Sequence, residues 1–177
     1  MSCRFLLSEI DEREVASKEA YSIFEPTVAL EVDGSNVFHR LRIDGAKHTV
    51  IMHSREQWIS ETVRVVEDLR EHPKSEGEYN YWLYGTGFGF NLTRKEDTLN
   101  IHLKVSSAGP TQGASYPQSI RIGTLSANEW IGAILSVSTE LSNMFVRLNP
   151  ETYHDRLFQR QQQDLASLKK WLESSEE

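Results

Sequence analysis

The sequence has little of what holds small secreted domains together, because Cys3 is the single cysteine among 177 residues. One cysteine cannot form an intrachain disulfide, so a secreted disulfide scaffold is excluded. The chain also lacks a run of about 18 apolar residues, which is the length that a membrane span needs. The Met1-Ser2 start does not fit N-myristoylation. We therefore expect a cytoplasmic protein that does not act at a membrane.

The sequence patterns of familiar catalytic and metal sites are also missing. Neither G-x-S-x-G nor C-G-x-C occurs, so no side chain lies in either of these patterns of a catalytic nucleophile. The six histidines include no H-E-x-x-H and no pair at helical i, i+4 spacing. We assign no catalytic residue, no metal ligand and no cofactor. An enzyme remains an alternative to the hypotheses below.

Positive charge is scarce relative to negative charge. The chain has 26 acidic and 19 basic residues, net charge -7, and residues 1–80 alone carry 16 acidic and 10 basic residues, net -6. A nucleic-acid partner is not expected, because phosphate binding needs a basic surface. An acidic face instead favours a protein partner that is basic.

The first half of the chain predicts strands followed by a helix. Residues 3–7 are expected to form a short strand, and residues 11–22 a helix. Residues 28–33 and 37–43 alternate apolar and polar side chains between Asp-Gly turns, which is typical of an antiparallel meander. We expect a third strand at Thr49–His53, then a helix that Ser54 caps and that ends at His72-Pro73.

The second half predicts the same order of elements. Strands are expected at 79–92, 99–105 and 120–122, followed by a helix that Ser126 or Asn128 caps and that Asn149-Pro150 ends. The chain is therefore predicted to be one α+β domain over residues 1–177. An antiparallel sheet of about six or seven strands should carry two or three amphipathic helices on one face. The expected core is apolar and comprises Leu30, Val32, Leu41, Ile43, Trp58, Ile59, Val63, Val66, Phe88, Phe90, Ile101, Leu103, Ile131, Leu135, Leu141 and Phe145.

Three glycines in the segment Gly85-Thr-Gly87-Phe-Gly89 form the first candidate contact site. Their spacing fits neither G-x-G-x-x-G nor the P-loop. On one regular strand, Gly85, Gly87 and Gly89 would share a face, and such a stripe lets a ligand or a partner chain approach the backbone. The alternative is a glycine stripe that the protein's own elements cover.

A third helix, expected at about residues 151–173, forms the second candidate, and residues 151–177 would then be a C-terminal interaction arm. Two heptads of an apolar seam run along it, with Gln161 as the one polar member. The seam either packs on the protein's own sheet or contacts a partner, including a second copy in a homodimer. The partner-contact residues in that case are Phe158, Leu165, Leu168, Trp171 and Leu172.

The order of elements resembles that of WapI-type and related bacterial immunity proteins. Three segments carry the resemblance: Thr49–Leu69, Phe88–Val105 and Ile120–Phe145. It implies a non-enzymatic, acidic protein of the bacterial cytoplasm that neutralises a toxin by binding it. Our leading hypothesis is thus a non-catalytic protein-binding module, a candidate toxin-immunity or defence-related inhibitor. The alternatives are a small-ligand binder or enzyme that uses the Gly85/Gly87/Gly89 strand, and a homo-oligomeric accessory protein.

Overall fold

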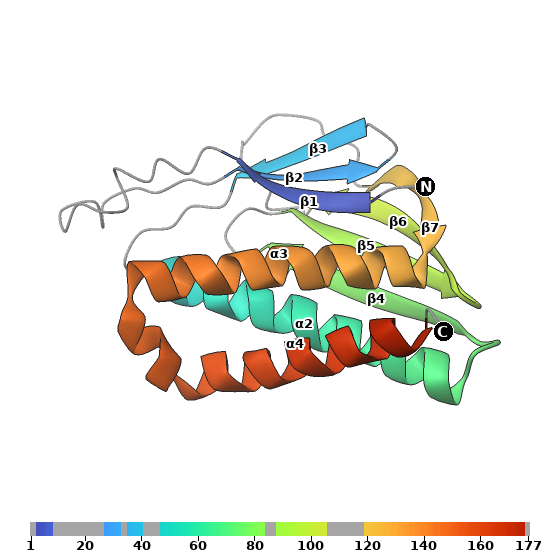
Figure 1. The fold of residues 1–177 in the computed structure, drawn as a ribbon. Coiled ribbons are helices and arrows are strands. Elements are labelled where there is room, and N and C mark those ends of the chain that lie inside the picture. Colours follow the sequence, from blue (N-terminus) through green and yellow to red (C-terminus); the bar gives the residue numbers. More distant parts are fainter. Residues whose placement is uncertain are drawn as a thin grey trace, which may run out of the picture.

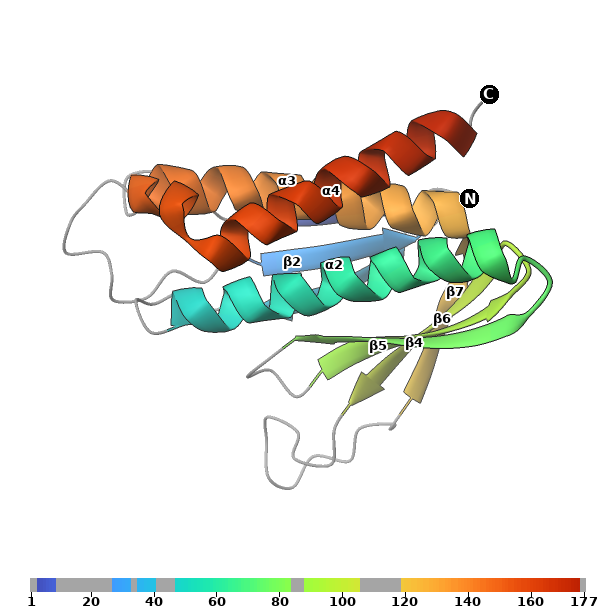
Figure 2. The ribbon, with the colours of Figure 1, turned by 90° about the horizontal axis from the view of Figure 1, so that it is seen from below.

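The computed structural model describes residues 3–8, 27–32, 35–40, 47–83, 88–105 and 119–175, which form an α+β fold with three α-helices (Figure 1). The helices are α2 (Lys47–Glu71), α3 (Ala127–Leu148) and α4 (Arg156–Ser175). All three lie on the same side of a four-stranded antiparallel sheet (Figure 2). Helix α4 packs along α2 and α3, which lie nearer to the sheet. The predicted α+β class, with an antiparallel sheet and three helices, is confirmed.

The strands belong to two sheets, so one sheet of six or seven strands is more than the structure shows. The larger sheet has the order β4-β5-β6-β7, and its strands are Glu76–Leu83, Phe88–Lys95, Thr98–Val105 and Ser119–Ser126. The smaller group has the order β1-β2-β3 and comprises Cys3–Ser8, Thr27–Val32 and Ser35–Arg40. Every neighbouring pair is antiparallel. The alternating patterns thus located strands at residues 28–32, 37–40 and 99–105, but the single strand expected at 79–92 is two strands, β4 and β5.

The expected strand at Thr49–His53 is wrong, because these residues belong to the start of helix α2. A short apolar run does not distinguish a strand from part of a buried helix. The same correction applies to Ser54, which is buried inside the helix and does not cap it. The helix expected at residues 11–22 lies outside the described residues.

Helix α3 begins as its sequence predicts. The Ser126 side chain accepts a hydrogen bond from the Glu129 backbone, and the Glu129 carboxylate accepts one from the backbone of Ser126, which is a capping box. This backbone contact lowers the pKa of Glu129. Asn149 ends α3 and also caps a short 3₁₀ helix, η2 (Pro150–His154), so α4 begins only at Arg156.

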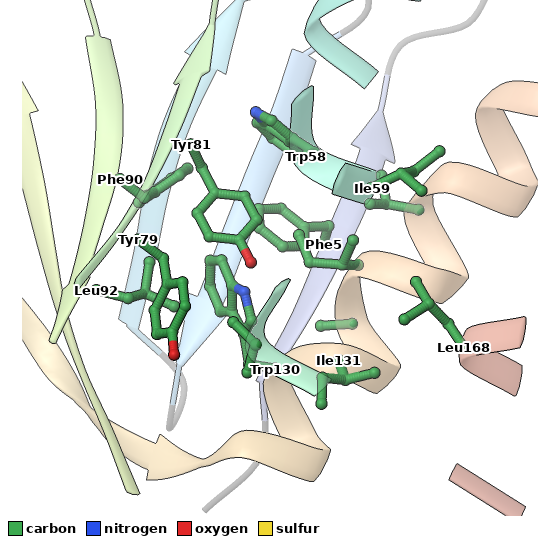
Figure 3. Packing of buried hydrophobic residues seen from close by; sticks show 14 of the residues in the cluster. Phe5, Trp58, Ile59, Tyr79, Tyr81, Phe90, Leu92, Trp130, Ile131 and Leu168 are labelled. Atoms are coloured by element: carbon green, nitrogen blue, oxygen red, sulfur yellow. The ribbon is translucent and has the colours of Figure 1, made fainter. Parts of the chain in front are cut away.

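Aromatic side chains from distant parts of the chain form the centre of the core (Figure 3). Trp130 of α3 is fully buried, and its ring centroid lies 5.2 Å from that of Tyr81 on β4 and 5.6 Å from that of Phe5 on β1. Phe5 also meets Trp58 of α2, with 5.3 Å between the centroids. The N-terminal strand therefore closes the core between the helices and the larger sheet. Of the expected core, the side chains that are buried here are Trp58, Ile59, Val66, Phe90, Ile101, Leu103, Ile131, Leu141 and Phe145.

The turn between α2 and β4 is held by a buried arginine. Arg94 of β5 donates from Nη2 to the backbone oxygen of His72 at 3.2 Å and to Ser75 Oγ at 2.8 Å. Its Nε donates to the Tyr79 hydroxyl at 3.0 Å, and that hydroxyl donates to Asp68 Oδ2 at 2.7 Å. Burial, together with the Asp68 contact, raises the pKa of Tyr79. These bonds fix the end of α2 against the sheet.

Replacing Tyr81 with phenylalanine should change how stability depends on alkaline pH. Burial raises the pKa of the Tyr81 hydroxyl, which lies 3.0 Å from Thr62 Oγ1. The folded chain therefore keeps a proton that the unfolded chain releases near pH 10, and this stabilising contribution is complete below about pH 10 and declines above it. We expect Tyr81→Phe to cost about 1 kcal/mol at neutral pH through the lost hydrogen bond.

The difference in the free energy of unfolding between wild type and Tyr81→Phe should narrow as the pH rises past about 10. Urea unfolding at a series of pH values measures it. Tyr153→Phe is the matched control, since Tyr153 is 58% exposed. A gap that stays constant through the alkaline range would contradict the role of the buried hydroxyl.

Candidate functional site

The single strand expected at residues 79–92, which would carry the glycine stripe, is wrong. Strands β4 and β5 pair antiparallel in this region, with Leu83 opposite Phe88. Gly85 and Gly87 lie outside the described residues. Gly89 lies on β5 opposite Trp82.

The space left by Gly89 is occupied by the protein's own tryptophan. A Cβ atom at Gly89 would come within 2.6 Å of Trp82 Cε3 and 2.9 Å of Cδ2. The half-buried indole of Trp82 thus packs against the β5 backbone at Gly89. The backbone oxygen of Trp82 accepts a hydrogen bond from Trp58 Nε1 at 3.0 Å, which ties this point of the sheet to α2. The glycine serves close packing of an aromatic ring on the sheet.

Gly89→Ala should therefore move Trp82. The new methyl group would also meet the Tyr81 backbone oxygen at 2.9 Å, which cannot move as a side chain can. We expect a loss of about 1–3 kcal/mol in the free energy of unfolding, typical of overpacking. Urea unfolding measures this loss, and the ring displacement should alter the tryptophan emission of the native state. Unchanged stability and emission would show that the ring has room to move.

Trp82 belongs to the outer face of the larger sheet, the face turned away from the helices (Figure 2). Alternate residues of β6 show the division: Leu99, Ile101 and Leu103 are buried in the core, whereas the residues between them are partly exposed. Among the described elements, none packs on this outer face. Its side chains across the four strands are polar apart from Trp82: Glu76, Glu78, Asn80, Asn91, Thr93, Lys95, Thr98, Asn100, His102, Lys104, Ser119, Arg121, Thr124 and Ser126.

Hydrogen bonds between strands order the side chains of the outer face. Asn91 Nδ2 donates to Glu78 Oε1 at 2.7 Å and to Asn80 Oδ1 at 2.9 Å. At the other edge, Thr124 Oγ1 donates to Asn100 Oδ1 at 2.6 Å and accepts from Arg121 Nη2 at 3.2 Å. Side chains that are already hydrogen-bonded to each other lose little further conformational entropy on binding, so the surface is pre-organised.

One end of the outer face carries unneutralised positive charge. The register places Trp82, Gly89, Lys104 and Ser119 in one row across the sheet, with His102 and Arg121 opposite each other in the next row. Arg121 faces outward with His102, and Ile122, the extra residue of the bulge that follows, packs against the core. None of the ion pairs between described residues involves Lys104 or Arg121. An aromatic side chain on β4 and two cations on β6 and β7 of the same face can receive an apolar group and an anion together.

The free edge of the sheet at β4 is closed by helix α2. Gln57 Oε1 accepts from the backbone N–H of Trp82 at 2.8 Å, and Glu61 Oε2 accepts from that of Asn80 at 3.3 Å. Arg64 donates to the backbone oxygen of Glu78. Helix side chains therefore occupy the bonding positions that an added strand would need. Strand addition by a partner at β4 would require these hydrogen bonds to break first.

Comparisons of the chain with models of protein families, with curated proteins and with solved structures give no match. No helix among the described residues is long and apolar enough to span a membrane. Within the same residues, no three His, Cys, Asp or Glu side chains gather closely enough to hold a metal ion.

The seam of α4 faces the protein's own helices. Phe158, Leu165 and Leu168 are buried in the core, and Trp171 and Leu172 are partly buried against it. Packing within the chain was one of the two alternatives, but the surface involved is α2 and α3 and not the sheet. A partner contact through the three buried residues would require α4 to leave the bundle. Residues 156–175 therefore form a docked helix in this structure.

The polar member of that seam meets a residue that the sequence did not single out. Arg55 of α2 is 1% exposed, and its Nε donates to Gln161 Oε1 of α4 at 2.7 Å. Its Nη1 donates to Ser142 Oγ of α3, and its guanidinium carbon lies 5.1 Å from the ring centroids of both Phe145 and Phe158. Burial lowers the pKa of Arg55 to about 10, so the group is charged at neutral pH. Arg55 joins the three helices and is not accessible to a ligand.

Two signals in the sequence could have revealed this contact. Arg55 precedes Trp58 and Ile59 by three and four residues, which puts it on the apolar face of its helix. Gln161 interrupts an apolar seam, and a buried polar side chain needs a hydrogen-bonding partner.

Proposed function

We propose that the chain is a non-catalytic protein-binding module that receives its partner on the outer face of the β4–β7 sheet. The observation that carries this proposal is the half-buried indole of Trp82, seated on Gly89 within a face of cross-bonded polar side chains. Tryptophan within a pre-organised polar surround is typical of binding hot spots. The hydrogen-bonded amides and hydroxyls can pair with the side chains and backbone of a partner.

A blocking substitution on the outer face tests the proposal. Thr93 is exposed on the central strand β5, so Thr93→Arg would project a long charged side chain from the middle of the face. Thr139→Arg is the matched control, because Thr139 is exposed on α3, on the side of the molecule that carries the helices. Each immobilised variant is exposed to a lysate of the cells that express the protein, and captured proteins are quantified by mass spectrometry.

We expect a stoichiometric partner that wild type and Thr139→Arg retain and that Thr93→Arg loses by about tenfold or more, equivalent to about 1.4 kcal/mol. Equal capture by all three proteins would refute the outer face as the binding surface. Circular dichroism of each variant checks that the fold is unchanged.

The resemblance to immunity proteins extends the proposal to a partner that is a toxin, met in the bacterial cytoplasm. Under this extension the captured partner is an active toxin whose activity stops when the protein is added at equal concentration and returns with Thr93→Arg. A partner whose activity is unaffected would separate the binding function from inhibition.

A further inference from the structure

We infer that the segment of the partner that crosses the outer face is acidic where it meets Lys104 and Arg121. This inference rests on the proposed function and adds the chemistry of the partner. The net charge of -7 taken over the whole chain favours a basic partner, but binding responds to the charges at the contact surface. At the Trp82 end of the outer face, those charges are positive.

Charge is distributed unevenly across the outer face, and this distribution indicates which end would bind an acidic segment. Lys104 and Arg121 lie on the neighbouring strands β6 and β7, with His102 directly opposite Arg121. The register therefore keeps the two cations within roughly 5–10 Å of each other at their backbone positions. Their ammonium and guanidinium groups are not paired with any described carboxylate. Two adjacent unpaired cations form a site for one or two carboxylates.

The opposite end of the same face has a different character. Glu76 lies directly opposite Lys95, so these two charges offset each other, and Glu78 accepts a hydrogen bond from Asn91. A long polyanion such as single-stranded nucleic acid would have to lie along these carboxylates, and only two cations would hold it. A polypeptide can place its carboxylates at one end alone. The charge pattern therefore favours an acidic protein segment over a nucleic acid.

Trp82 adds a second element to the recognition. Its indole lies in the same row as Lys104, with only Gly89 between them on β5. An apolar side chain of the partner could stack on this ring while a neighbouring carboxylate reaches Lys104. We expect the preferred segment to combine acidic residues with an adjacent aromatic or aliphatic residue.

Fluorescence anisotropy with two labelled peptides tests the inference on the full chain. Both peptides are about ten residues long, enough to cross the sheet at roughly 3.3 Å per residue, and share one leucine-tyrosine pair. One carries glutamates and the other carries lysines at the same positions. A labelled oligothymidine is the third probe. Lys104→Glu combined with Arg121→Glu reverses the cationic end, and Arg160→Glu combined with Lys170→Glu makes the same charge change on exposed positions of α4.

We expect the glutamate peptide to bind wild type at least about tenfold more tightly than the lysine peptide, with an affinity that falls as salt rises. The reversal at Lys104 and Arg121 should remove this preference, and the reversal on α4 should leave it intact. Tighter binding of the lysine peptide or of oligothymidine, or an unchanged preference in the Lys104/Arg121 variant, would overturn the inference. If neither peptide binds while capture of the partner still depends on Thr93, the inference fails and the proposed function stands.

Discussion

Gln161→Leu is expected to lower the free energy of unfolding by about 3 kcal/mol, although leucine has nearly the size of glutamine. Gln161 is 1% exposed, and its Oε1 accepts hydrogen bonds from both Nε and Nη2 of Arg55. Removing the acceptor leaves a guanidinium that is charged at neutral pH with fewer partners inside the three-helix junction. An unsatisfied buried charge costs more than the hydrogen bond itself contributes.

A double-mutant cycle separates this effect from simple loss of packing. Arg55→Met with Gln161→Leu removes the charge together with its acceptor, so the double variant should recover most of the loss and lie within about 1 kcal/mol of wild type. Gln163→Leu is the matched control, because Gln163 is exposed on the same helix. Urea unfolding gives the four free energies. Additive losses, or a Gln161→Leu effect no larger than that of Gln163→Leu, would show that the buried contact contributes little.

The Arg55–Gln161 contact shows where the sequence was informative and where it was not. Helical periodicity located α3 and α4, and local chemistry located the Ser126 cap, because each signal lies within a few residues. The contact itself joins residues 106 positions apart. A charged side chain on an amphipathic helix is normally assigned to solvent, so the position of Arg55 on the apolar face was a signal of burial, but the pairing of Arg55 with Gln161 depends on the packing of α2 against α4.

The candidate site on the sheet could likewise be predicted only in part from the sequence. Alternation predicted that Asn100, His102 and Lys104 share one face of β6, and the structure places them on the outer face. Alternation with Ile122 also places Arg121 on the outer face, but the bulge shifts the alternation after Ile122, so that Gly123 lies opposite the buried Ile101. The sequence could not show that Trp82 covers Gly89, since this depends on the pairing of β4 with β5. The sequence therefore showed which polar residues the outer face contains, but the strand register decides which of them lie next to each other.

Trp130→Ala is expected to have the largest effect of any single substitution in the core, a loss of about 3–5 kcal/mol. Trp130 is fully buried where α3 meets the sheet, and its ring lies against Tyr81, Phe5 and Phe90, with 6.1 Å between its centroid and that of Phe90. Alanine would remove these edge-to-face contacts and leave a cavity among rigid rings that cannot readily collapse. Because the total stability of a domain is only about 5–15 kcal/mol, the variant should unfold at markedly lower urea.

Trp171→Ala on α4 provides the same chemical change at a partly buried position and should cost clearly less. Trp130→Phe should lie between wild type and Trp130→Ala, because it keeps an aromatic ring at the centre of the cluster. The comparison also bears on the N-terminal strand, since Phe5 reaches the core by packing on Trp130, Trp58 and Phe90. If Trp130 holds β1 in place, the Trp130→Ala variant should expose the amides of residues 3–8 to hydrogen exchange before those of β5 and β6. Simultaneous loss of protection in all three strands would show instead that the cluster unfolds as one cooperative unit.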